Sequence, residues 1–235
     1  MLLAAGEGRR LGSMTLDRPK PMLEIGGRPI LEHNIRFLSR YGIRELIVNL
    51  HHCSEAITDY FGDGAAWGVQ ISYSYEPSLL GTAGAVKNVA HLLDQTFIVM
   101  YGDNLTTCDL GRLIEFHRRK RGIATAALFY REDATASGIA ELDVNDRIVR
   151  FLEKPRSDEI FSRWVNAGIL IMEPAVLDFI PKSSASDFGR EVLPALLAAN
   201  RPIFGYRMNE ELWWVDSPED LERTRRTFRD HKSEV

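Results

Sequence analysis

The sequence predicts an α/β fold with a mixed, mostly parallel central sheet. Up to about residue 120, short apolar runs alternate with segments of helical periodicity, which is typical of βαβ units. The run Phe97–Tyr101 is apolar throughout, as in a strand buried on both faces. Beyond residue 120 several strands follow one another, so this part is expected to be more antiparallel.

The elements of the first half are predicted from periodicity and from end signals. A helix is expected over Pro29–Tyr41, because apolar residues recur at helical spacing and Gly42 follows. Asp109 is placed to cap a helix that ends in the basic run His117–Arg121. The other expected elements are a strand at Glu45–Leu50, a helix at Ser54–Phe61 capped by Ser54, an alternating strand at Val69–Tyr75, and a helix from the glycine turn at 81–84 to about Leu93.

The second half is predicted to contain more strands than helices. The expected strands are Ala124–Tyr130, Ile139–Asp143, Ile148–Glu153, Ala167–Met172 and Ile203–Met208. Helices are expected from about Asp187 to Ala199 and over Pro218–Arg229. Ser217 and Asp220 have the spacing of a capping box at the start of the last helix.

Composition is that of an ordinary soluble protein and excludes several classes. The 235 residues are 45% hydrophobic and 26% charged, and the net charge of -4 argues against general nucleic-acid binding. Cys53 and Cys108 fit neither a zinc site nor a disulfide framework, so free thiols in a reducing cytoplasm are expected. We see no signal peptide, and no apolar run approaches the roughly 20 residues of a membrane helix.

The stretch Leu2–Leu23 contains the features of an anion site. Gly6 and Gly8 allow a tight turn after a short strand, and such a turn can bind phosphate through its backbone N–H groups. Arg10 and Lys20 add positive charge. A dinucleotide fingerprint is excluded because Leu11 stands at the third glycine position, and no G-K-[ST] triplet of a Walker loop follows. From these residues alone, a glycine turn with a solvated basic loop remains an equal alternative.

Two motifs resemble a known signature. The pattern L-x-A-G-x-G-x-R-L at Leu3–Leu11, followed by R-P-K-P at Arg18–Pro21, resembles that of the sugar-1-phosphate nucleotidylyltransferases. The G-T-A-G form of the turn at 81–84 resembles their mannose-1-phosphate guanylyltransferase-like members more than the thymidylyl or uridylyl enzymes. The resemblance extends from Leu3 to Asp216 and the closing helix. Arg9 departs from it, since the family usually has a small hydroxyl residue there. The strand before the loop is shorter than usual in the family, which leaves open whether the N-terminus is complete.

The resemblance implies a particular architecture. The fold is expected to be Rossmann-like, a three-layer α/β/α arrangement of the nucleotide-diphospho-sugar transferase type, without the C-terminal β-helix of some members. Residues 1–235 would form a single catalytic domain. Its nucleotide-binding half would end near residue 120, and residues from about 121 would bind the sugar phosphate.

Two aspartates are the expected ligands of Mg²⁺. Asp103 belongs to the segment Gly102–Asn104, which directly follows the apolar strand, where a carboxylate faces the ligand cleft of an α/β sheet. By itself G-D-N is also a common turn. Asp216, in W-W-V-D before the last helix, resembles the second metal aspartate of the family, although it could instead favour the helix N-terminus.

The resemblance also assigns further residues by position. Catalytic roles are implied for Arg10, Lys20 and Asp103. Nucleotide binding is implied for Leu3, Ala4, Ala5, Gly6, Gly8, Arg10, Lys20, Gly81, Thr82 and Asp103. Sugar-phosphate binding is implied for Gly138, Glu153, Lys154, Asn166 and Gly168. From the residues alone, the turn at Gly81 could serve helix packing, and E-K-P at Glu153 could be an exposed strand end.

The expected reaction is Mg²⁺-dependent transfer of a nucleotidyl group from a nucleoside triphosphate, GTP by preference, to a sugar 1-phosphate. Mannose 1-phosphate and a manno-heptose 1-phosphate are the leading acceptors. A UTP, dTTP or CTP enzyme is the first alternative, and a non-catalytic sugar-nucleotide-binding regulatory subunit is an alternative of another class. A glycosyltransferase is disfavoured because no D-x-D motif stands at a strand end. No nucleic-acid or membrane partner is expected, and a homo-oligomer such as a dimer stays open.

Overall fold

The computed structural model describes residues 1–182 and 185–228, which pack into two units. We call the first the loop unit, because it holds the glycine-rich loop. It comprises Leu2–Ser78, Tyr101–Thr107 and the described residues from Glu211. The second, the central unit, comprises Met1, Leu79–Met100 and Cys108–Glu210. The expected single catalytic domain with a division near residue 120 stays a prediction.

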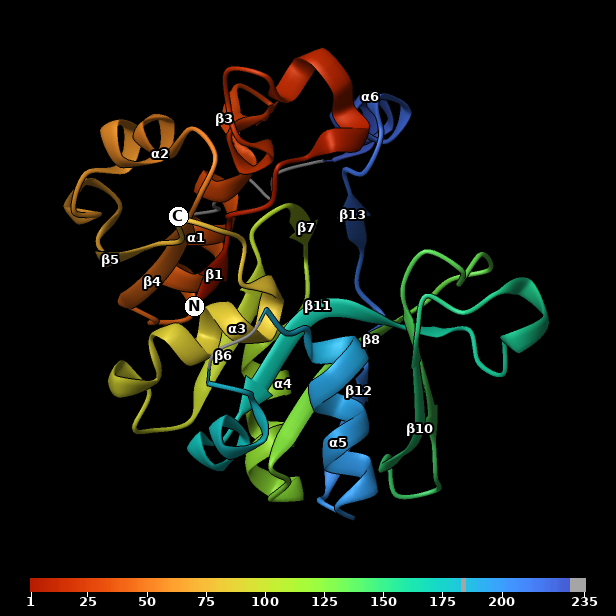
Figure 1. Ribbon diagram of the computed structural model, residues 1–235. Helices are drawn as coiled ribbons and strands as arrows, with labels where there is room; N and C mark the ends of the chain where they lie inside the picture. Colours follow the sequence, from red (N-terminus) through yellow and green to blue (C-terminus); the bar gives the residue numbers. More distant parts are fainter. Residues whose placement is uncertain (183–184, 229–235) are drawn as a thin grey trace. The chain divides into compact units, whose positions relative to one another are not determined.

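Three parallel strands form the sheet of the loop unit (Figure 1). Strand β1 (Leu2–Leu3) pairs with β4 (Glu45–Leu50), and β4 pairs with β5 (Gln70–Tyr75). Helices α1 (Ile30–Arg40) and α2 (Ser54–Phe61) connect them. The predicted strand β4 and helices α1 and α2 are confirmed within a residue or so at each end.

Two details of this unit differ from the sequence-based prediction. The N-cap of α2 is Cys53, in a left-handed conformation with φ 48°, and Ser54 is already helical. The alternation in β5 also fails at its end, because Ser74 is buried whereas Tyr75 is 59% exposed. The apolar face of this strand therefore does not continue to the strand's last residue.

Two short antiparallel strand pairs complete the loop unit, and neither was predicted from the sequence. Strands β2 (Glu24–Ile25) and β3 (Arg28–Pro29) are antiparallel. Strands β7 (Asn104–Thr106) and β13 (Leu212–Trp214) also lie side by side and antiparallel (Figure 1). Helix α6 (Pro218–Thr227) follows β13, and the Ser217 hydroxyl accepts a hydrogen bond from Asp220 N over 3.1 Å, as predicted for the cap. The predicted helix end at Arg229 lies outside the described residues.

One apolar cluster holds the segments of the loop unit together. It draws on the glycine-rich loop, the β2–β3 pair, the β7–β13 pair and α6, through Leu11, Leu23, Ile25, Ile30, Leu105, Trp213, Val215 and Leu221. Leu11 adjoins Arg10, Leu105 lies two residues after Asp103, and Val215 adjoins Asp216. Burial of these neighbours therefore fixes the backbone from which the charged side chains project.

The central unit has a mixed sheet centred on its longest strand, β11 (Trp164–Met172). This strand is antiparallel to β6, β8 and β9; β10 is antiparallel to β9, and β12 is parallel to β8. The remaining strands are β6 (Phe97–Tyr101), β8 (Ala124–Tyr130), β9 (Gly138–Leu142), β10 (Ile148–Glu153) and β12 (Ile203–Arg207). The predicted α/β fold with a mixed sheet is confirmed.

The helices of the central unit are α3 (Gly81–Asn88), α4 (Leu110–Lys120) and α5 (Leu193–Ala198). Asp109 caps α4 as predicted, since its side chain accepts from Arg112 N over 3.0 Å. The helix expected from Asp187 begins instead as a π-helix at Phe188–Val192, and α5 continues it. Short 3₁₀ segments occur at Arg9–Thr15, Lys20–Met22, Ala65–Trp67, Ala90–Leu92, Ser157–Glu159 and Pro174–Phe179.

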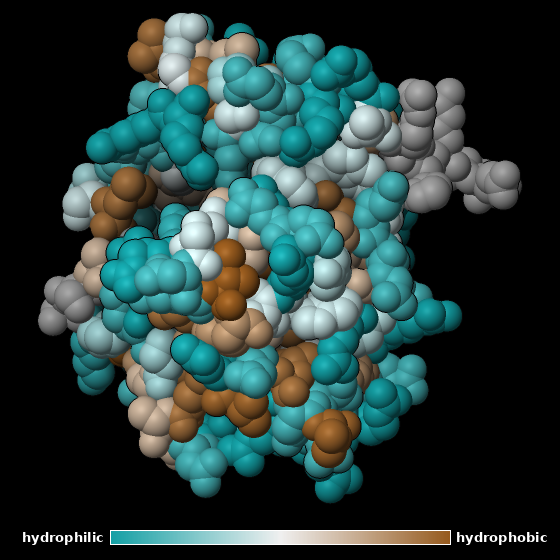
Figure 2. Space-filling view, turned by 90° about the vertical axis from the view of Figure 1, so that its right-hand side faces the viewer, coloured by the Kyte–Doolittle hydropathy of each residue, from teal (hydrophilic) through white to brown (hydrophobic). Residues whose placement is uncertain are grey.

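The face drawn in Figure 2 is mainly hydrophilic, and its hydrophobic residues lie in scattered groups. Within residues 1–182 and 185–228, no helix combines the length and the apolar character needed to cross a bilayer.

Candidate active site

The glycine-rich loop turns sharply at Gly8. This residue has φ 65°, and its carbonyl accepts hydrogen bonds from Leu11 N at 2.9 Å and from the Thr15 hydroxyl at 3.2 Å. A Cβ at Gly8 would lie only 3.0 Å from Thr15 Cγ2 and 3.1 Å from Lys20 Cβ. By contrast, a Cβ at Gly6 would meet nothing within 4 Å. Gly8 is thus required by the local fold, whereas the space above Gly6 is open.

A buried polar relay fixes the start of this loop. Ala4 N donates to Asn49 Oδ1 over 2.7 Å, and Asn49 Nδ2 donates to Glu76 Oε1 over 2.8 Å. Asn49 and Glu76 are both buried, with 4% and 1% of their surface exposed. Neither residue was predicted from the sequence. A polar residue within the apolar strand E-L-I-V-N-L was the available signal for Asn49.

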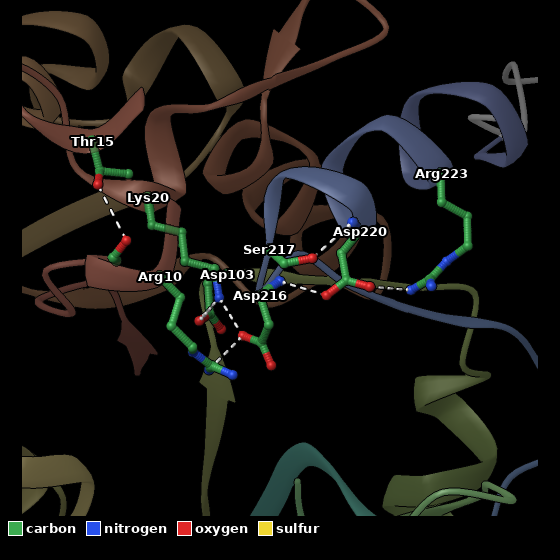
Figure 3. Close-up of polar contacts among 9 residues, drawn as sticks. Arg10, Thr15, Lys20, Asp103, Asp216, Ser217, Asp220 and Arg223 are labelled. Atoms are coloured by element: carbon green, nitrogen blue, oxygen red, sulfur yellow. Dashed lines mark hydrogen bonds and ion pairs between the residues drawn. The ribbon is translucent and has the colours of Figure 1, made fainter. Parts of the chain in front are cut away.

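Four charged side chains converge beside the loop (Figure 3). Lys20 Nζ donates to Asp103 Oδ2 at 2.6 Å and to Asp216 Oδ1 at 2.9 Å. Arg10 Nη2 lies 3.1 Å from the same oxygen of Asp216. The structure therefore brings together Arg10, Lys20, Asp103 and Asp216, which the sequence analysis had selected from three separate segments.

The electrostatics of this cluster are dominated by Lys20, whose side chain is buried. Burial alone would lower its pKa, but attraction first to Asp103 and then to Asp216 outweighs burial, so the pKa of Lys20 is raised. Lys20 is consequently a permanent cation at neutral pH. Arg10 differs, because its side chain is 67% exposed and can reach toward a ligand in solvent.

The two aspartates are positioned by the β7–β13 pair and by the start of α6. Asn104, next to Asp103, is paired with Trp214, two residues before Asp216. Asp216 N also donates to Asp220 Oδ2 over 3.3 Å, so the carboxylate of the capping sequence reaches Asp216 N (Figure 3). This role of Asp220 was not predicted from the sequence.

The pair of aspartates fits a magnesium ion by donor chemistry. Mg²⁺ in enzymes commonly takes one or two carboxylates and completes its shell with water and substrate phosphate oxygens. Asp103 and Asp216 offer such oxygens around a point that already attracts a cation, the Lys20 ammonium. Among the described residues there is no group of three or more His, Cys, Asp or Glu side chains that could hold a metal by itself. A metal here would thus need substrate or water oxygens as well.

The predicted sugar-phosphate residues lie in the central unit. Glu153 and Gly138 are register partners in the β10–β9 pair, and a Cβ at Gly138 would overlap the Glu153 carboxylate and the Phe151 ring. Lys154 follows with a left-handed φ of 50°, which turns the chain out of β10. Burial, and next the charge of Asp187, raise the pKa of Glu153. Glu153 is therefore a carboxyl group in a poorly solvated position.

Asn166 and Gly168 lie on β11, where the register with β8 shifts between Asn166 and Leu170. Asn166 Oδ1 accepts a hydrogen bond from Gly168 N over 3.0 Å, and Gly168 has φ 78°. This local bulge is a backbone irregularity of the kind that re-aims side chains next to binding sites.

Gly81 and Thr82 also lie in the central unit, at the start of α3. Gly81 has φ 73°, and a Cβ there would overlap the carbonyl oxygen of Ser186. Thr82 Oγ1 donates to Asp187 Oδ2 over 2.8 Å and accepts from Phe188 N over 3.0 Å. Asp187 is a further residue of this region that sequence analysis did not select.

The sequence is similar to proteins of a described family. A model of the family described as nucleotidyl transferase matches residues 1–221. The chain is 39% identical to a mannose-1-phosphate guanylyltransferase of Mycobacterium tuberculosis, over 95% of this chain and 62% of that protein. It is 36% identical to a UTP--glucose-1-phosphate uridylyltransferase of Synechocystis sp., over 92% of this chain and 59% of that protein. The chain thus spans about three fifths of the length of these curated relatives.

Solved structures share the fold. HddC from Yersinia pseudotuberculosis aligns with a TM-score of 0.82 and 24% identity, over 97% of this chain and 98% of that chain. A UDP-glucose pyrophosphorylase complexed with UDP-glucose aligns with a TM-score of 0.83 and 18% identity, over 96% and 95% of the two chains. The Rossmann-like architecture predicted from the sequence is thereby confirmed.

Proposed function

Because the chain belongs to the nucleotidyl transferase family, we propose that it transfers a nucleotidyl group from a nucleoside triphosphate to a sugar 1-phosphate. The observation that carries this proposal is the contact of Lys20 with Asp103 and Asp216, with Arg10 beside them. A buried cation and a pair of carboxylates next to a glycine-rich turn suit a polyphosphate substrate better than a neutral one.

The proposed reaction is an in-line displacement. A phosphate oxygen of the sugar 1-phosphate attacks the α-phosphorus of the nucleotide, and the bond from this phosphorus to the bridging oxygen of pyrophosphate breaks. The electron pair leaves with pyrophosphate. The attacking phosphate is already ionised, so no general base is needed, and catalysis comes from positioning and charge neutralisation.

The residues of the loop unit act on the nucleotide in this proposal. The backbone of Leu3–Gly8 binds phosphate, and the open space above Gly6 lets a phosphate approach the backbone closely. Arg10 holds the β- and γ-phosphates, as its exposed guanidinium allows. Lys20 neutralises charge that develops around the α-phosphate.

Asp103 and Asp216 would hold Mg²⁺, together with phosphate and water oxygens. Bound there, the ion would supply positive charge to the phosphate oxygens. Lys20 orients both carboxylates through its two hydrogen bonds.

The central unit would bind the acceptor and part of the nucleotide. Lys154 is proposed to hold the phosphate of the sugar 1-phosphate, and Glu153 and Asn166 to bind hydroxyl groups. The absence of a side chain at Gly138 leaves space for the Glu153 carboxylate, and Gly168 allows the left-handed backbone conformation at its position. Gly81 and Thr82 belong to the turn proposed to lie against the base and ribose.

For the substrates we propose GTP with mannose 1-phosphate or a manno-heptose 1-phosphate. The support is the relative named mannose-1-phosphate guanylyltransferase, which is 39% identical. UTP or dTTP with glucose 1-phosphate is the competing pair, supported by the relative named UTP--glucose-1-phosphate uridylyltransferase at 36% identity.

The test is pyrophosphate release with Mg²⁺, crossing GTP, UTP, dTTP, CTP and ATP with mannose, glucose and manno-heptose 1-phosphates. We expect release with one pair, and a fall of about 10²–10³-fold in Asp103→Asn. The control Asp59→Asn changes an exposed aspartate of α2 and should retain full activity. Nucleotide binding without pyrophosphate release, across the panel, would instead support the non-catalytic regulatory subunit.

A further inference from the structure

The turn Leu80–Gly84 and the segment Ser186–Gly189 are joined by backbone hydrogen bonds. Ser186 N donates to the carbonyl of Leu80 over 2.9 Å. The Ser186 carbonyl in turn accepts from Ala83 N at 3.0 Å and from Gly84 N at 3.2 Å. Because a side chain at Gly81 would overlap that carbonyl, only glycine lets the two segments approach so closely.

Side chains of the same two segments add a second connection. Asp187 uses both carboxylate oxygens within the unit, one for Gly189 N at 2.9 Å and one for the Thr82 hydroxyl at 2.8 Å. The Thr82 oxygen accepts from Phe188 N over 3.0 Å. The Thr82 hydroxyl proton is thus committed to Asp187, so this hydroxyl is better placed to hold the turn than to donate to a ligand.

The segment 186–189 also contacts the predicted sugar carboxylate. A Cβ at Gly189 would overlap the carboxyl group of Glu153, so Glu153 packs directly on the backbone of Gly189. The charged groups around Glu153 are Asp187, Lys154 and Arg190. Of these, Asp187 raises the pKa of Glu153, after burial, whereas Lys154 and Arg190 act in the opposite direction.

We propose that Asp187 is a positioning residue that couples the Leu80–Gly84 turn to the Glu153 carboxylate, so that nucleotide and sugar 1-phosphate strengthen each other's binding. The coupling rests on the proposed function, which assigns nucleotide to the turn and sugar to Glu153. Its physical basis is a continuous contact path within one unit: Thr82 to Asp187, Asp187 to Gly189 N, and Gly189 to Glu153. Ordering of either end by its ligand lowers the entropic cost of ordering the other.

A simpler role for Asp187 is that of an N-cap, and substitutions separate the two roles. Asn is as good an N-cap as Asp, so Asp187→Asn keeps the acceptor for Gly189 N. The same variant removes the negative charge beside Glu153, and its amide NH2 group replaces the carboxylate oxygen that accepts from the Thr82 hydroxyl. Thr82→Val removes the hydroxyl at nearly constant shape, and Thr82→Ser restores it. Asp94→Asn, at an exposed aspartate of the same unit, is the matched control.

The measurement is the Kd of the α,β-methylene analogues of GTP and UTP, with and without mannose 1-phosphate or glucose 1-phosphate. We expect the sugar phosphate to tighten nucleotide binding about fivefold or more in the unchanged protein and in Asp94→Asn. This ratio of the two Kd values should fall toward one in Asp187→Asn and Thr82→Val, and return in Thr82→Ser. In the double variant Asp187→Asn/Thr82→Val the ratio should be no smaller than in either single variant. A factor that persists in Asp187→Asn would overturn the proposal.

Two ligand-free readouts distinguish failure of this inference from failure of the proposed function. In Asp187→Asn, amide exchange at Ala83 and Phe188 should quicken, and the pKa of Glu153, followed by carboxyl ¹³C shifts, should fall. If these changes appear while neither nucleotide nor sugar phosphate binds, the positioning role stands and the proposed function fails. If neither readout changes, Asp187 is only an N-cap, whatever the enzyme catalyses.

Discussion

Lys20 Nζ donates a 2.6 Å hydrogen bond to Asp103 Oδ2, across 83 positions of sequence. The same ammonium reaches Asp216, so three segments of the loop unit meet at one buried cation. Two carboxylates this close would repel each other without it. The contact therefore has a structural role as well as the proposed catalytic one.

Lys20→Met should impair both roles. We expect kcat to fall about 10²–10³-fold, because a charge near the α-phosphate is lost. The free energy of unfolding at pH 7 should fall by about 1–3 kcal/mol, since two partly exposed carboxylates lose their partner. Urea unfolding and pyrophosphate release measure the two effects. Unchanged stability would show that Lys20 is dispensable for the fold.

The pH dependence of this contact has a definite sign. The pKa of Lys20 is raised above the ordinary lysine value of 10.5, so Lys20 binds its proton more tightly in the folded protein than in the unfolded protein. The stabilisation is fully present below pH 10.5 and is lost as the pH rises through the higher folded pKa. The difference in unfolding free energy between the unchanged protein and Lys20→Met should therefore be constant from pH 8 to 10 and shrink above that range.

Gly6 and Gly8 should respond differently to alanine. Gly6→Ala places a methyl group in open space, so stability should stay within about 0.5 kcal/mol, while KM for the nucleotide rises about tenfold or more. Gly8→Ala forces a left-handed φ onto alanine and should lower stability by about 1–2 kcal/mol. Gly68→Ala isolates the backbone strain, because Gly68 has nearly the same left-handed conformation (φ 68°, ψ 29°) and a Cβ there would meet only Arg44 Nη1, at 3.7 Å. An unchanged KM in Gly6→Ala would argue against close approach of phosphate there.

The relay from Ala4 through Asn49 to Glu76 predicts a charge-dependent loss of stability. Asn49→Asp would bring a second carboxylate against buried Glu76, so one of the two must be protonated. We expect a loss of about 1–3 kcal/mol at pH 7, which recovers as the pH falls and the raised carboxyl pKa is crossed. Adding Glu76→Gln should restore stability at pH 7, because an amide then faces the new carboxylate. No recovery in the double variant would contradict the relay.

Local patterns predicted most of the regular elements. The apolar runs at Glu45–Leu50, Phe97–Tyr101, Ala124–Tyr130 and Ile148–Glu153 became strands with the expected bounds. Asp109 and Ser217 cap the helices that follow them. These elements could be predicted because burial and capping leave a signal within a few residues.

The missed features depend on contacts between distant segments. Strands β7 and β13 have three residues each, too few for a period, and exist only because they pair with each other. Asn49, Glu76 and Asp187 are polar residues whose partners are set by register and packing, which single-sequence patterns do not contain. Arg10, Lys20 and Asp103 were candidates from local patterns, the resemblance favoured Asp216, and the roles of all four stay predictions.

Glu153→Gln should stabilise the fold at pH 7 and weaken binding of the sugar 1-phosphate. The pKa of Glu153 is raised, first by burial and then by Asp187, so this carboxyl group binds its proton more tightly in the folded protein than in the unfolded one. Ionisation of Glu153 therefore opposes folding as the pH rises above the ordinary pKa of 4.5. Removing the charge should therefore increase the free energy of unfolding at pH 7, by about 1 kcal/mol or less after solvent screening, and have no effect near pH 4. KM for the sugar 1-phosphate should rise roughly 10- to 100-fold, because an ionised acceptor of hydroxyl hydrogen bonds is lost. Glu141→Gln, at an exposed position of β9, should change neither quantity. If Glu153→Gln is less stable than the unchanged protein at pH 7, the carboxylate stabilises the fold, and the proposal that Glu153 serves sugar binding at a cost in stability is wrong.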